Sequence, residues 1–319
     1  MKIFFLILIS LSLNASDFLT NYRNNGISEI EKQMDLELTK NKYWSKYIKN
    51  KDTKFGYLES YTNVLTCNKT NSTLNLYRLN NKKQFKFQKE YAAFTGKLKG
   101  DKLREGDLKT PIGVYKLTKK LSNVDSFYGP MAFVTSYPNI YDKYRDKGGH
   151  GIWIHGLPSK QERDEFTKGC IAINNTNIKC LDRNIDIFKT VLIIDSEKVE
   201  QDVSKEILSS ILSQLYKWRY SWKYNDINSY LSFYDSKFVR SDGMNYERFK
   251  NYKTRVFKKI EKRSIIFTNI NLLPYPDTTD IYQLTFKEFY KSDTFEFIGD
   301  KVLVIRLQIN NKIKILTEK

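Results

Sequence analysis

The hydrophobic pattern of this chain changes twice along its length, and these changes constrain the fold more than any other feature of the sequence. From Ile27 to about Lys49 apolar residues recur mostly every three to four positions, as in an amphipathic helix. After Gly56, short runs of β-branched and aromatic residues are punctuated by Asn, Lys and Gly, which is typical of strands and turns. Near residue 200 the helical spacing returns. The sequence therefore predicts a multidomain protein with a mostly β middle part.

We place the segment boundaries where the pattern changes. The prediction is an N-terminal helical segment at residues 16–56, a mostly β domain at 57–196 and an α+β domain at 200–319. Within the last domain, apolar stripes predict a long helix over Val203–Trp222 and a shorter one over Ile227–Tyr234. Strands are predicted at Ser264–Leu273, Thr279–Tyr290 and Lys301–Ile315.

The first fifteen residues have the composition of a signal peptide. Lys2 precedes an apolar stretch, and the stretch ends in the small-residue sequence Asn14-Ala15-Ser16. The apolar run is shorter than the roughly 20 residues that a membrane-spanning helix needs. We therefore expect residues 1–15 to be a cleaved leader, and the protein to be exported rather than integral to the membrane.

The charge balance indicates an anionic partner. The chain has 54 Lys and Arg against 36 Asp and Glu, a formal charge of +18. The basic residues are scattered, and an exported protein rarely meets nucleic acid, so we expect no nucleic-acid partner. An anionic polymer of the cell envelope fits better.

One segment combines the residue types needed for covalent acyl transfer. The run Gly151-Ile152-Trp153-Ile154-His155-Gly156 is followed by Thr167-Lys168-Gly169-Cys170. A cysteine attacks a carbonyl as its thiolate, and an imidazole takes the proton and later returns it to the leaving amine. The chain has two histidines, and His155 is the better candidate because it ends an apolar strand, whereas His150 lies in a glycine-rich turn.

Two glycines flank this pair. Gly156 permits a sharp exit from the strand that carries His155. Gly169 precedes Cys170, where a bend of the backbone would let amide groups around Lys168 and Gly169 converge on a developing oxyanion. We therefore predict Cys170 as nucleophile and His155 as base.

These motifs resemble the catalytic domain of the L,D-transpeptidases, also called the YkuD family. The resemblance rests on His155-Gly156, on Thr167-Lys168-Gly169-Cys170, and on the upstream run Glu105-Gly106-Asp107-Leu108-Lys109-Thr110-Pro111-Ile112-Gly113-Val114-Tyr115. It covers about residues 57–196 and implies a β-sandwich-like domain acting on peptidoglycan stem peptides, with the carbonyl of Gly156 orienting the histidine. We expect Asp107 to belong to a structural turn rather than to the catalytic group.

One position departs from the family pattern. The family usually has a second histidine where this chain has Lys168, and Ala172 stands where Arg or Asn is common. Lys168 could instead hold a substrate carboxylate as a point charge. Substrate contacts are expected from Lys168, Thr167, His150, Trp153 and Tyr137, and no metal or cofactor is expected.

The C-terminal part is similar to the cone-shaped nuclear-transport-factor-like fold, through Trp218, Trp222, Asp226, Tyr230, Phe233 and Tyr234. Together the two parts resemble the cell-shape L,D-carboxypeptidases of helical Gram-negative rods. That resemblance implies a periplasmic enzyme that removes D-alanine from a meso-diaminopimelate–D-alanine tetrapeptide stem. The alternatives are an L,D-transpeptidase, whose acceptor is an amine of another stem or of a protein, and a degenerate scaffold that only binds peptidoglycan.

Two further expectations stay open at this point. Cys67 and Cys180 are interpreted either as core residues or as a mutual disulfide, which an oxidising compartment would allow. The N-terminal helical segment is a candidate surface for a homodimer.

Overall fold

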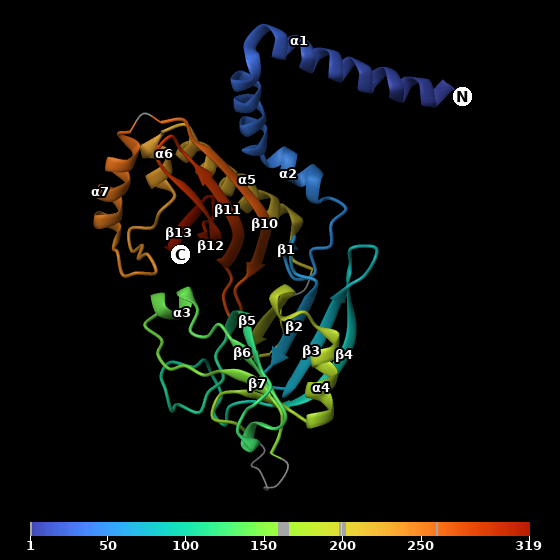
Figure 1. Ribbon diagram of the computed structural model, residues 1–319, viewed down its shortest axis with the longest axis vertical. Helices are drawn as coiled ribbons and strands as arrows, with labels where there is room; N and C mark the ends of the chain where they lie inside the picture. Colours follow the sequence, from blue (N-terminus) through green and yellow to red (C-terminus); the bar gives the residue numbers. More distant parts are fainter. Residues whose placement is uncertain (1, 159–165, 198, 200–201, 260) are drawn as a thin grey trace.

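The computed structural model describes residues 2–158, 166–197, 199, 202–259 and 261–319, and for residues 2–16 it describes the backbone only. The expected leader, residues 1–15, therefore lies outside the described side chains and stays a prediction. Figure 1 shows a β-rich domain joined to a C-terminal domain of helices and a curved sheet, with the N-terminal helices extending from the latter. Within the part of the chain that is described, no helix is long and apolar enough to span a bilayer.

The N-terminal helices are attached to the C-terminal domain. Helix α1 (Lys2–Leu38) is broken at Gly26, whose φ of 75° is not helical, and α2 (Asn41–Ile48) follows it. Trp44 and Ile48 of α2 are buried in the same core as the long helix α5 (Lys205–Lys223), and Asp35 of α1 pairs with Arg219 of α5. The segment is thus helical, as the sequence predicted, and it packs on the C-terminal domain.

The middle domain is mostly β, as predicted, and its strands close into a barrel. The barrel order is β2-β3-β4-β8-β7-β6-β5-β9. Its strands are β2 (Asn63–Asn68), β3 (Thr73–Leu79), β4 (Phe85–Phe94), β5 (Gly113–Leu121), β6 (Ala132–Thr135), β7 (Trp153–His155), β8 (Ile171–Ile173) and β9 (Thr190–Asp195). Short helices lie between them: η1 (Ser126–Tyr128), α3 (Ile140–Tyr144), α4 (Asn175–Asn184) and η2 (Ile187–Lys189). Alternate strand residues fill the barrel with apolar side chains such as Leu65, Ile154 and Ile171.

The C-terminal domain packs helices on one antiparallel sheet. Its helices are α5, α6 (Ile227–Ser232) and α7 (Tyr246–Phe257), and its sheet has the order β1-β10-β11-β12-β13. The strands are β1 (Tyr57–Leu58), β10 (Ser264–Pro274), β11 (Ile281–Lys291), β12 (Glu296–Leu307) and β13 (Ile313–Glu318).

Most elements predicted for this domain are present, with three differences. The prediction of one strand over Lys301–Ile315 was wrong, because a turn in which Asn311 has a φ of 59° divides this stretch between β12 and β13. Helix α7 was not predicted. Tyr57 and Leu58, which we placed in the middle domain, form β1 and pair with Leu272 and Asn271 of β10.

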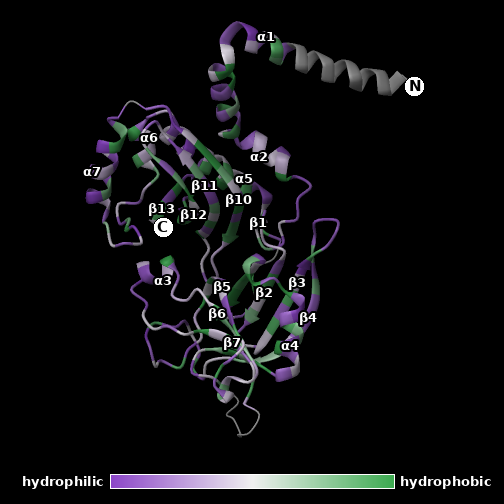
Figure 2. Cartoon of the chain, viewed as in Figure 1, coloured by the Kyte–Doolittle hydropathy of each residue, from purple (hydrophilic) through white to green (hydrophobic). Residues whose placement is uncertain are grey.

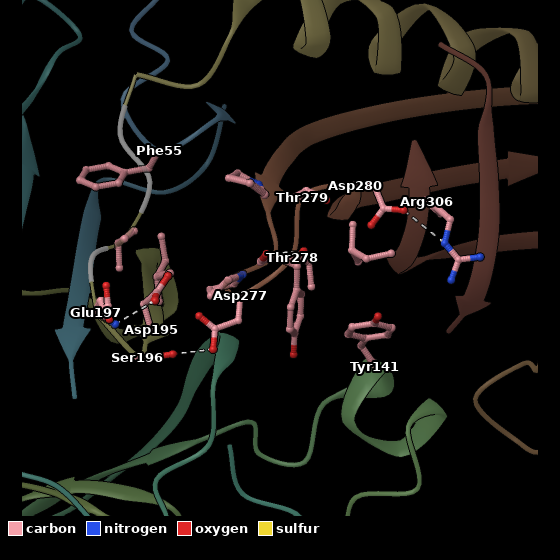
Figure 3. Close-up of a pocket in the computed structure, with 16 residues that line it drawn as sticks. Phe55, Tyr141, Asp195, Ser196, Glu197, Asp277, Thr278, Thr279, Asp280 and Arg306 are labelled. Atoms are coloured by element: carbon pink, nitrogen blue, oxygen red, sulfur yellow. Dashed lines mark hydrogen bonds and ion pairs between the residues drawn. The ribbon is translucent and has the colours of Figure 1, made fainter. Parts of the chain in front are cut away.

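A third apolar cluster joins the two domains. It includes Val64 and Val114 from the barrel and Leu273, Tyr275 and Leu316 from the C-terminal sheet. Figure 2 shows hydrophobic residues running along the strands of both domains, with hydrophilic residues on outer elements such as α7. A cavity of about 890 Å³ opens at the same junction, and Figure 3 shows Asp195 and Asp277 close together in its lining. The domains are therefore packed against each other rather than loosely tethered.

Candidate active site

Cys170 and His155 are brought together by two adjacent parallel strands. His155 is the last residue of β7, and Cys170 comes directly before β8. In the register of this pair, Ile154 lies opposite Ile171 and His155 opposite Ala172. His155 is 1% exposed, whereas Cys170 is half-buried at the surface of the barrel. The arrangement thus puts a buried imidazole and a more accessible sulfur on neighbouring strands.

The imidazole of His155 is fixed in orientation and in tautomer. Its Nδ1 lies 2.6 Å from the carbonyl oxygen of Gly156. A carbonyl oxygen only accepts hydrogen bonds, so Nδ1 carries the proton and Nε2 of the neutral ring is left as the basic nitrogen. The ring of Tyr128 meets the imidazole edge-on, with centroids 5.0 Å apart. This is the form of histidine that a general base requires.

The carbonyl of Gly156 is itself held by the next turn of chain. Asn175, at the start of α4, accepts a hydrogen bond from the amide of Leu157 at 2.8 Å and donates to the Leu157 carbonyl at 2.9 Å. A Cβ at position 156 would come within 2.4 Å of Asn175 Oδ1 and 2.7 Å of Pro130. Position 156 therefore accepts only glycine, which explains the His-Gly pair.

The turn before Cys170 is closed by Thr167. The Thr167 hydroxyl donates to the Cys170 carbonyl at 2.6 Å and accepts from the amide of Gly169 at 2.9 Å. Gly169 has a φ of 133°, and a Cβ there would lie 2.8 Å from the carbonyl oxygen of Lys109. Thr167, expected to touch substrate, is 5% exposed and shapes the turn. We expected the Gly169 amide to bind an oxyanion. In the resting protein it donates a hydrogen bond to the Thr167 hydroxyl.

A carbonyl from a neighbouring loop contacts the sulfur. Cys170 Sγ lies 3.4 Å from the oxygen of Gly151, within hydrogen-bonding range of a thiol. Tyr137 anchors the loop before Gly151: its hydroxyl donates to the Gly148 carbonyl at 2.7 Å, and its side chain is 6% exposed. Tyr137 thus supports the loop that precedes Gly151.

The other three residues predicted to contact substrate are Lys168, His150 and Trp153, and each is at least partly exposed. Lys168 is exposed, two residues before Cys170. The His150 side chain is 77% exposed, with Glu105 Oε2 3.5 Å from its Nδ1. Trp153 is half-buried and packs against Tyr128 at 5.0 Å between ring centroids. Their roles in binding substrate stay predictions.

Asp107 has a structural environment, as expected. Burial acts to raise its pKa, but hydrogen bonds from Lys102 and from the amides of Leu103, Arg104 and Lys109 outweigh burial and hold the pKa well below its usual range. A carboxylate held ionised by four donors is a poor proton carrier at neutral pH. It organises the loop that ends at β5.

The other two cysteines are free thiols, so the disulfide alternative is not realised. Cys67 is fully buried in the barrel core, and burial raises its pKa to about 12. The Cys67 thiol therefore lacks the surroundings of a nucleophile. Cys180 is half-buried on α4, near Lys89 and Tyr91. Across the described residues, no group of three or more His, Cys, Asp or Glu side chains is placed to hold a metal.

Sequence reasoning missed two residues of this site, Tyr128 and Asn175. Both come from other parts of the chain: Tyr128 lies 27 residues before His155, and Asn175 lies 19 residues after Gly156. Asn175 lies two positions after the buried strand β8, which is a weak signal for a functional side chain. Tyr128 carries no local signal that separates it from other aromatic residues.

Comparison with known proteins assigns both domains to families. A profile of the L,D-transpeptidase catalytic domain (YkuD) matches residues 62–194, and one of the Cds6 C-terminal NTF2-like domain matches residues 210–319. A candidate L,D-transpeptidase of Escherichia coli strain K12, YafK, is 32% identical over 111 residues. That match spans 34% of this chain and 42% of YafK, less than half of that relative's length.

Two solved structures are similar over both domains. The helical cell shape determining protein Pgp2 from Campylobacter jejuni is 36% identical, with a TM-score of 0.80 over 88% of this chain and 99% of that chain. Bd1075 from Bdellovibrio bacteriovorus is 27% identical, with a TM-score of 0.66 over 85% and 96%. The similarity extends through the junction between the two domains.

Proposed function

Because this chain belongs to the L,D-transpeptidase family and carries a C-terminal NTF2-like domain, we propose that it is a peptidoglycan L,D-carboxypeptidase. A role in peptidoglycan metabolism follows from the family. The reaction we propose is removal of the terminal D-alanine from tetrapeptide stems. The observation that supports it most is the pairing of β7 with β8, because the oriented imidazole of His155 ends one strand and the half-buried thiol of Cys170 directly precedes the other.

In the proposed first step, Nε2 of His155 takes the proton of Cys170, and the thiolate attacks the carbonyl between meso-diaminopimelate and D-alanine. The tetrahedral intermediate collapses, the carbon–nitrogen bond breaks, and the imidazolium gives its proton to the departing amine of D-alanine. A thioester to the remaining tripeptide is left on Cys170. The Nδ1 contact with the Gly156 carbonyl keeps the ring in the tautomer that both transfers need.

In the second step, water attacks the thioester carbonyl while His155 accepts a water proton, and the tripeptide leaves with a free carboxylate as Cys170 regains its proton. Two features support water as the acceptor. Lys168 replaces the second histidine of the family, and the chain is similar over nearly its whole length to a protein named for helical cell shape. The family match also supports an amine of another stem as acceptor, which would make the protein a transpeptidase.

The proposal includes location and assembly. The apolar leader at residues 1–15 supports export to the periplasm, where stem peptides lie.

Helix α1 extends away from the body of the protein in Figure 1, and it exposes Phe18, Leu19, Tyr22 and Ile27 at 45%, 62%, 50% and 64%. A second copy of the chain would cover these side chains, and sedimentation of the mature protein with and without residues 16–38 tests this.

The activity is tested with the mature protein and disaccharide tetrapeptide and pentapeptide muropeptides, with products identified by mass. We expect loss of one alanine from the tetrapeptide only, abolished in Cys170→Ala and retained in Cys180→Ser, the matched control. Cross-linked dimers would identify a transpeptidase instead. Unchanged substrate with wild-type protein would contradict catalysis and leave a peptidoglycan-binding role.

A further inference from the structure

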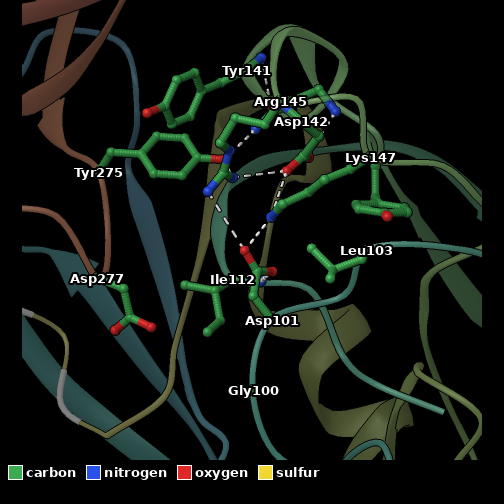
Figure 4. A network of polar contacts seen from close by, with 12 residues as sticks. Gly100, Asp101, Leu103, Ile112, Tyr141, Asp142, Arg145, Lys147, Tyr275 and Asp277 are labelled. Carbon is green, nitrogen blue, oxygen red and sulfur yellow. Dashed lines mark hydrogen bonds and ion pairs between the residues drawn. The ribbon is translucent and has the colours of Figure 1, made fainter. Parts of the chain in front are cut away.

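Four charged side chains of the barrel domain form a compact network at the junction of the two domains. Arg145 pairs with Asp142 at 3.2 Å and with Asp101 at 3.5 Å, and Lys147 pairs with Asp142 at 3.4 Å and also with Asp101. The side chains of Asp142 and Lys147 are 0% and 2% exposed. Figure 4 shows the four groups converging, with Tyr275 beside Arg145. Charges buried this deeply need every partner to keep a fixed geometry.

Tyr275 is supplied to this network by the C-terminal domain. It follows β10 and is 1% exposed. Its hydroxyl accepts from Asn139 Nδ2 at 3.1 Å and lies 3.5 Å from Arg145 Nη2. The Arg145 guanidinium also lies over the Tyr141 and Tyr275 rings, at 4.3 and 5.3 Å from their centroids. The position of the Arg145 guanidinium therefore depends in part on Tyr275 of the C-terminal domain.

The barrel accommodates the Tyr275 hydroxyl next to Gly113. A Cβ at Gly113 would lie 2.4 Å from the Tyr275 hydroxyl and 2.7 Å from that of Tyr115. Gly113 belongs to the motif that ends at Tyr115, and its lack of a side chain leaves room for the hydroxyl. The hairpin holds the tyrosine from its own side, because the Tyr275 amide donates to Ile281 at 2.8 Å and Thr278 donates to the Tyr275 carbonyl at 2.6 Å.

The network also holds the loop that leads to the sulfur. Beyond its side-chain pairs, Lys147 donates its amide to the Asp142 carbonyl at 2.9 Å. The next residue, Gly148, donates to Leu103 at 2.8 Å and accepts from Tyr137 at 2.7 Å. Three residues later the Gly151 carbonyl contacts Cys170 Sγ at 3.4 Å. A displacement of Lys147 would therefore move a group that touches the nucleophile.

We propose that Tyr275 of the C-terminal domain is a positioning residue for the active site, acting through Arg145, Asp101, Asp142 and Lys147 on the loop that contacts Cys170. The inference rests on the proposed function of Cys170, and it assigns to the accessory domain a direct part in organising the catalytic centre. The C-terminal domain then completes the site rather than only binding polymer.

The test compares Tyr275→Phe, which keeps the buried ring and removes the hydroxyl, with wild type in the mature full-length chain. The matched control is Tyr216→Phe, a buried tyrosine of the same domain that packs on Trp44 and Phe267. We expect Tyr275→Phe to lower kcat for D-alanine release by roughly tenfold with KM within about twofold, because small displacements of reacting groups mainly affect the chemical step. Tyr216→Phe leaves kcat unchanged.

A second readout needs no substrate. The rate of Cys170 alkylation by iodoacetamide, followed by mass mapping of the Cys170 peptide to separate it from Cys180, reports how the sulfur is held. We expect this rate to fall several-fold in Tyr275→Phe and to stay at the wild-type value in Tyr216→Phe. Wild-type alkylation and kcat in Tyr275→Phe would overturn the inference.

Arg145→Lys provides an independent variant if Tyr275→Phe does not fold, since Arg145 is 28% exposed and lysine keeps the charge but not the fork. The same loss of alkylation rate is expected, and a wild-type rate would overturn the inference. If the wild-type protein releases no D-alanine, the proposed function fails, while the alkylation comparison still decides whether Tyr275 positions Cys170.

Discussion

The Nδ1 atom of His155 lies 2.6 Å from the carbonyl oxygen of Gly156, so the backbone of the next residue orients the imidazole. This contact depends on the path of the chain after the strand. Asn175 fixes that path through both backbone groups of Leu157. The orientation of the proposed base, His155, therefore depends on Asn175, which does not contact the imidazole through any of these hydrogen bonds.

Asn175→Ala should lower activity without removing any group that reacts. The amide and carbonyl of Leu157 lose their partner, so we expect the free energy of unfolding to fall by about 1–2 kcal/mol and kcat for D-alanine release to fall roughly tenfold or more. Asn177→Ala, two positions along α4, is the control. Chemical denaturation and steady-state kinetics measure both effects, and wild-type kcat in Asn175→Ala would show that the Leu157 contacts do not orient His155.

Gly169→Ala should damage the nucleophile's turn through two separate effects. The φ of 133° disfavours alanine, and the new Cβ would meet the Lys109 carbonyl at 2.8 Å. We expect about 1–3 kcal/mol of destabilisation and a loss of Cys170 alkylation. Gly243→Ala is the control, because Gly243 has a φ of 87° but no atom within 4 Å of its added Cβ. Equal effects of the two changes on alkylation would argue against a specific role of the turn.

Lys168→Gln should weaken substrate binding and leave chemistry in place. Lys168 is exposed beside Cys170, so a contact between its ammonium and a stem carboxylate would be worth about 0.5–1 kcal/mol. That corresponds to a KM increase of roughly two- to fivefold at unchanged kcat. Lys179→Gln on α4 removes an exposed charge elsewhere and serves as control. A KM that does not respond to Lys168→Gln, nor to added salt, would remove Lys168 from the binding site.

Asp195→Asn should change how stability depends on pH. Asp195 ends β9 and faces Asp277 of the C-terminal domain (Figure 3). Burial, with Asp277 nearby, raises the pKa of Asp195 to about 6, although the amide of Glu197 acts to lower it. Because the folded state holds this proton more tightly than the unfolded state does, the contribution favours folding at pH values below about 4 and is lost as the pH rises through about 6.

Removing this carboxyl should therefore stabilise the protein near pH 7.5 by about 1–3 kcal/mol, with little difference at pH 4. Thermal unfolding of wild type and Asp195→Asn across this range measures the effect. Asp146→Asn, at an exposed aspartate, controls for the change in net charge. A uniform shift at all pH values would mean that folding does not raise the pKa of Asp195.

Some elements were missed although signals for them exist. Helix α7 begins after Asn245, whose side chain accepts from the Arg248 amide, and an asparagine before such a segment is a typical N-cap. The turn between β12 and β13 contains Asn310-Asn311, and asparagine is one of the residues that tolerate a positive φ.

The sequence by itself determined the helices and strands with strong periodicity, such as α5 and β10, and the choice of Cys170 with His155, because a chain with two histidines offers few partners for a thiol. Only the tertiary structure decided what holds these groups. Asn139 meets Tyr275 across 136 residues, and Asn175 meets Leu157 across 18. Periodicity reports whether a side chain is buried, because burial repeats with the geometry of the element. It does not report which partner a polar group meets, because that depends on how the barrel closes and how the second domain packs on it.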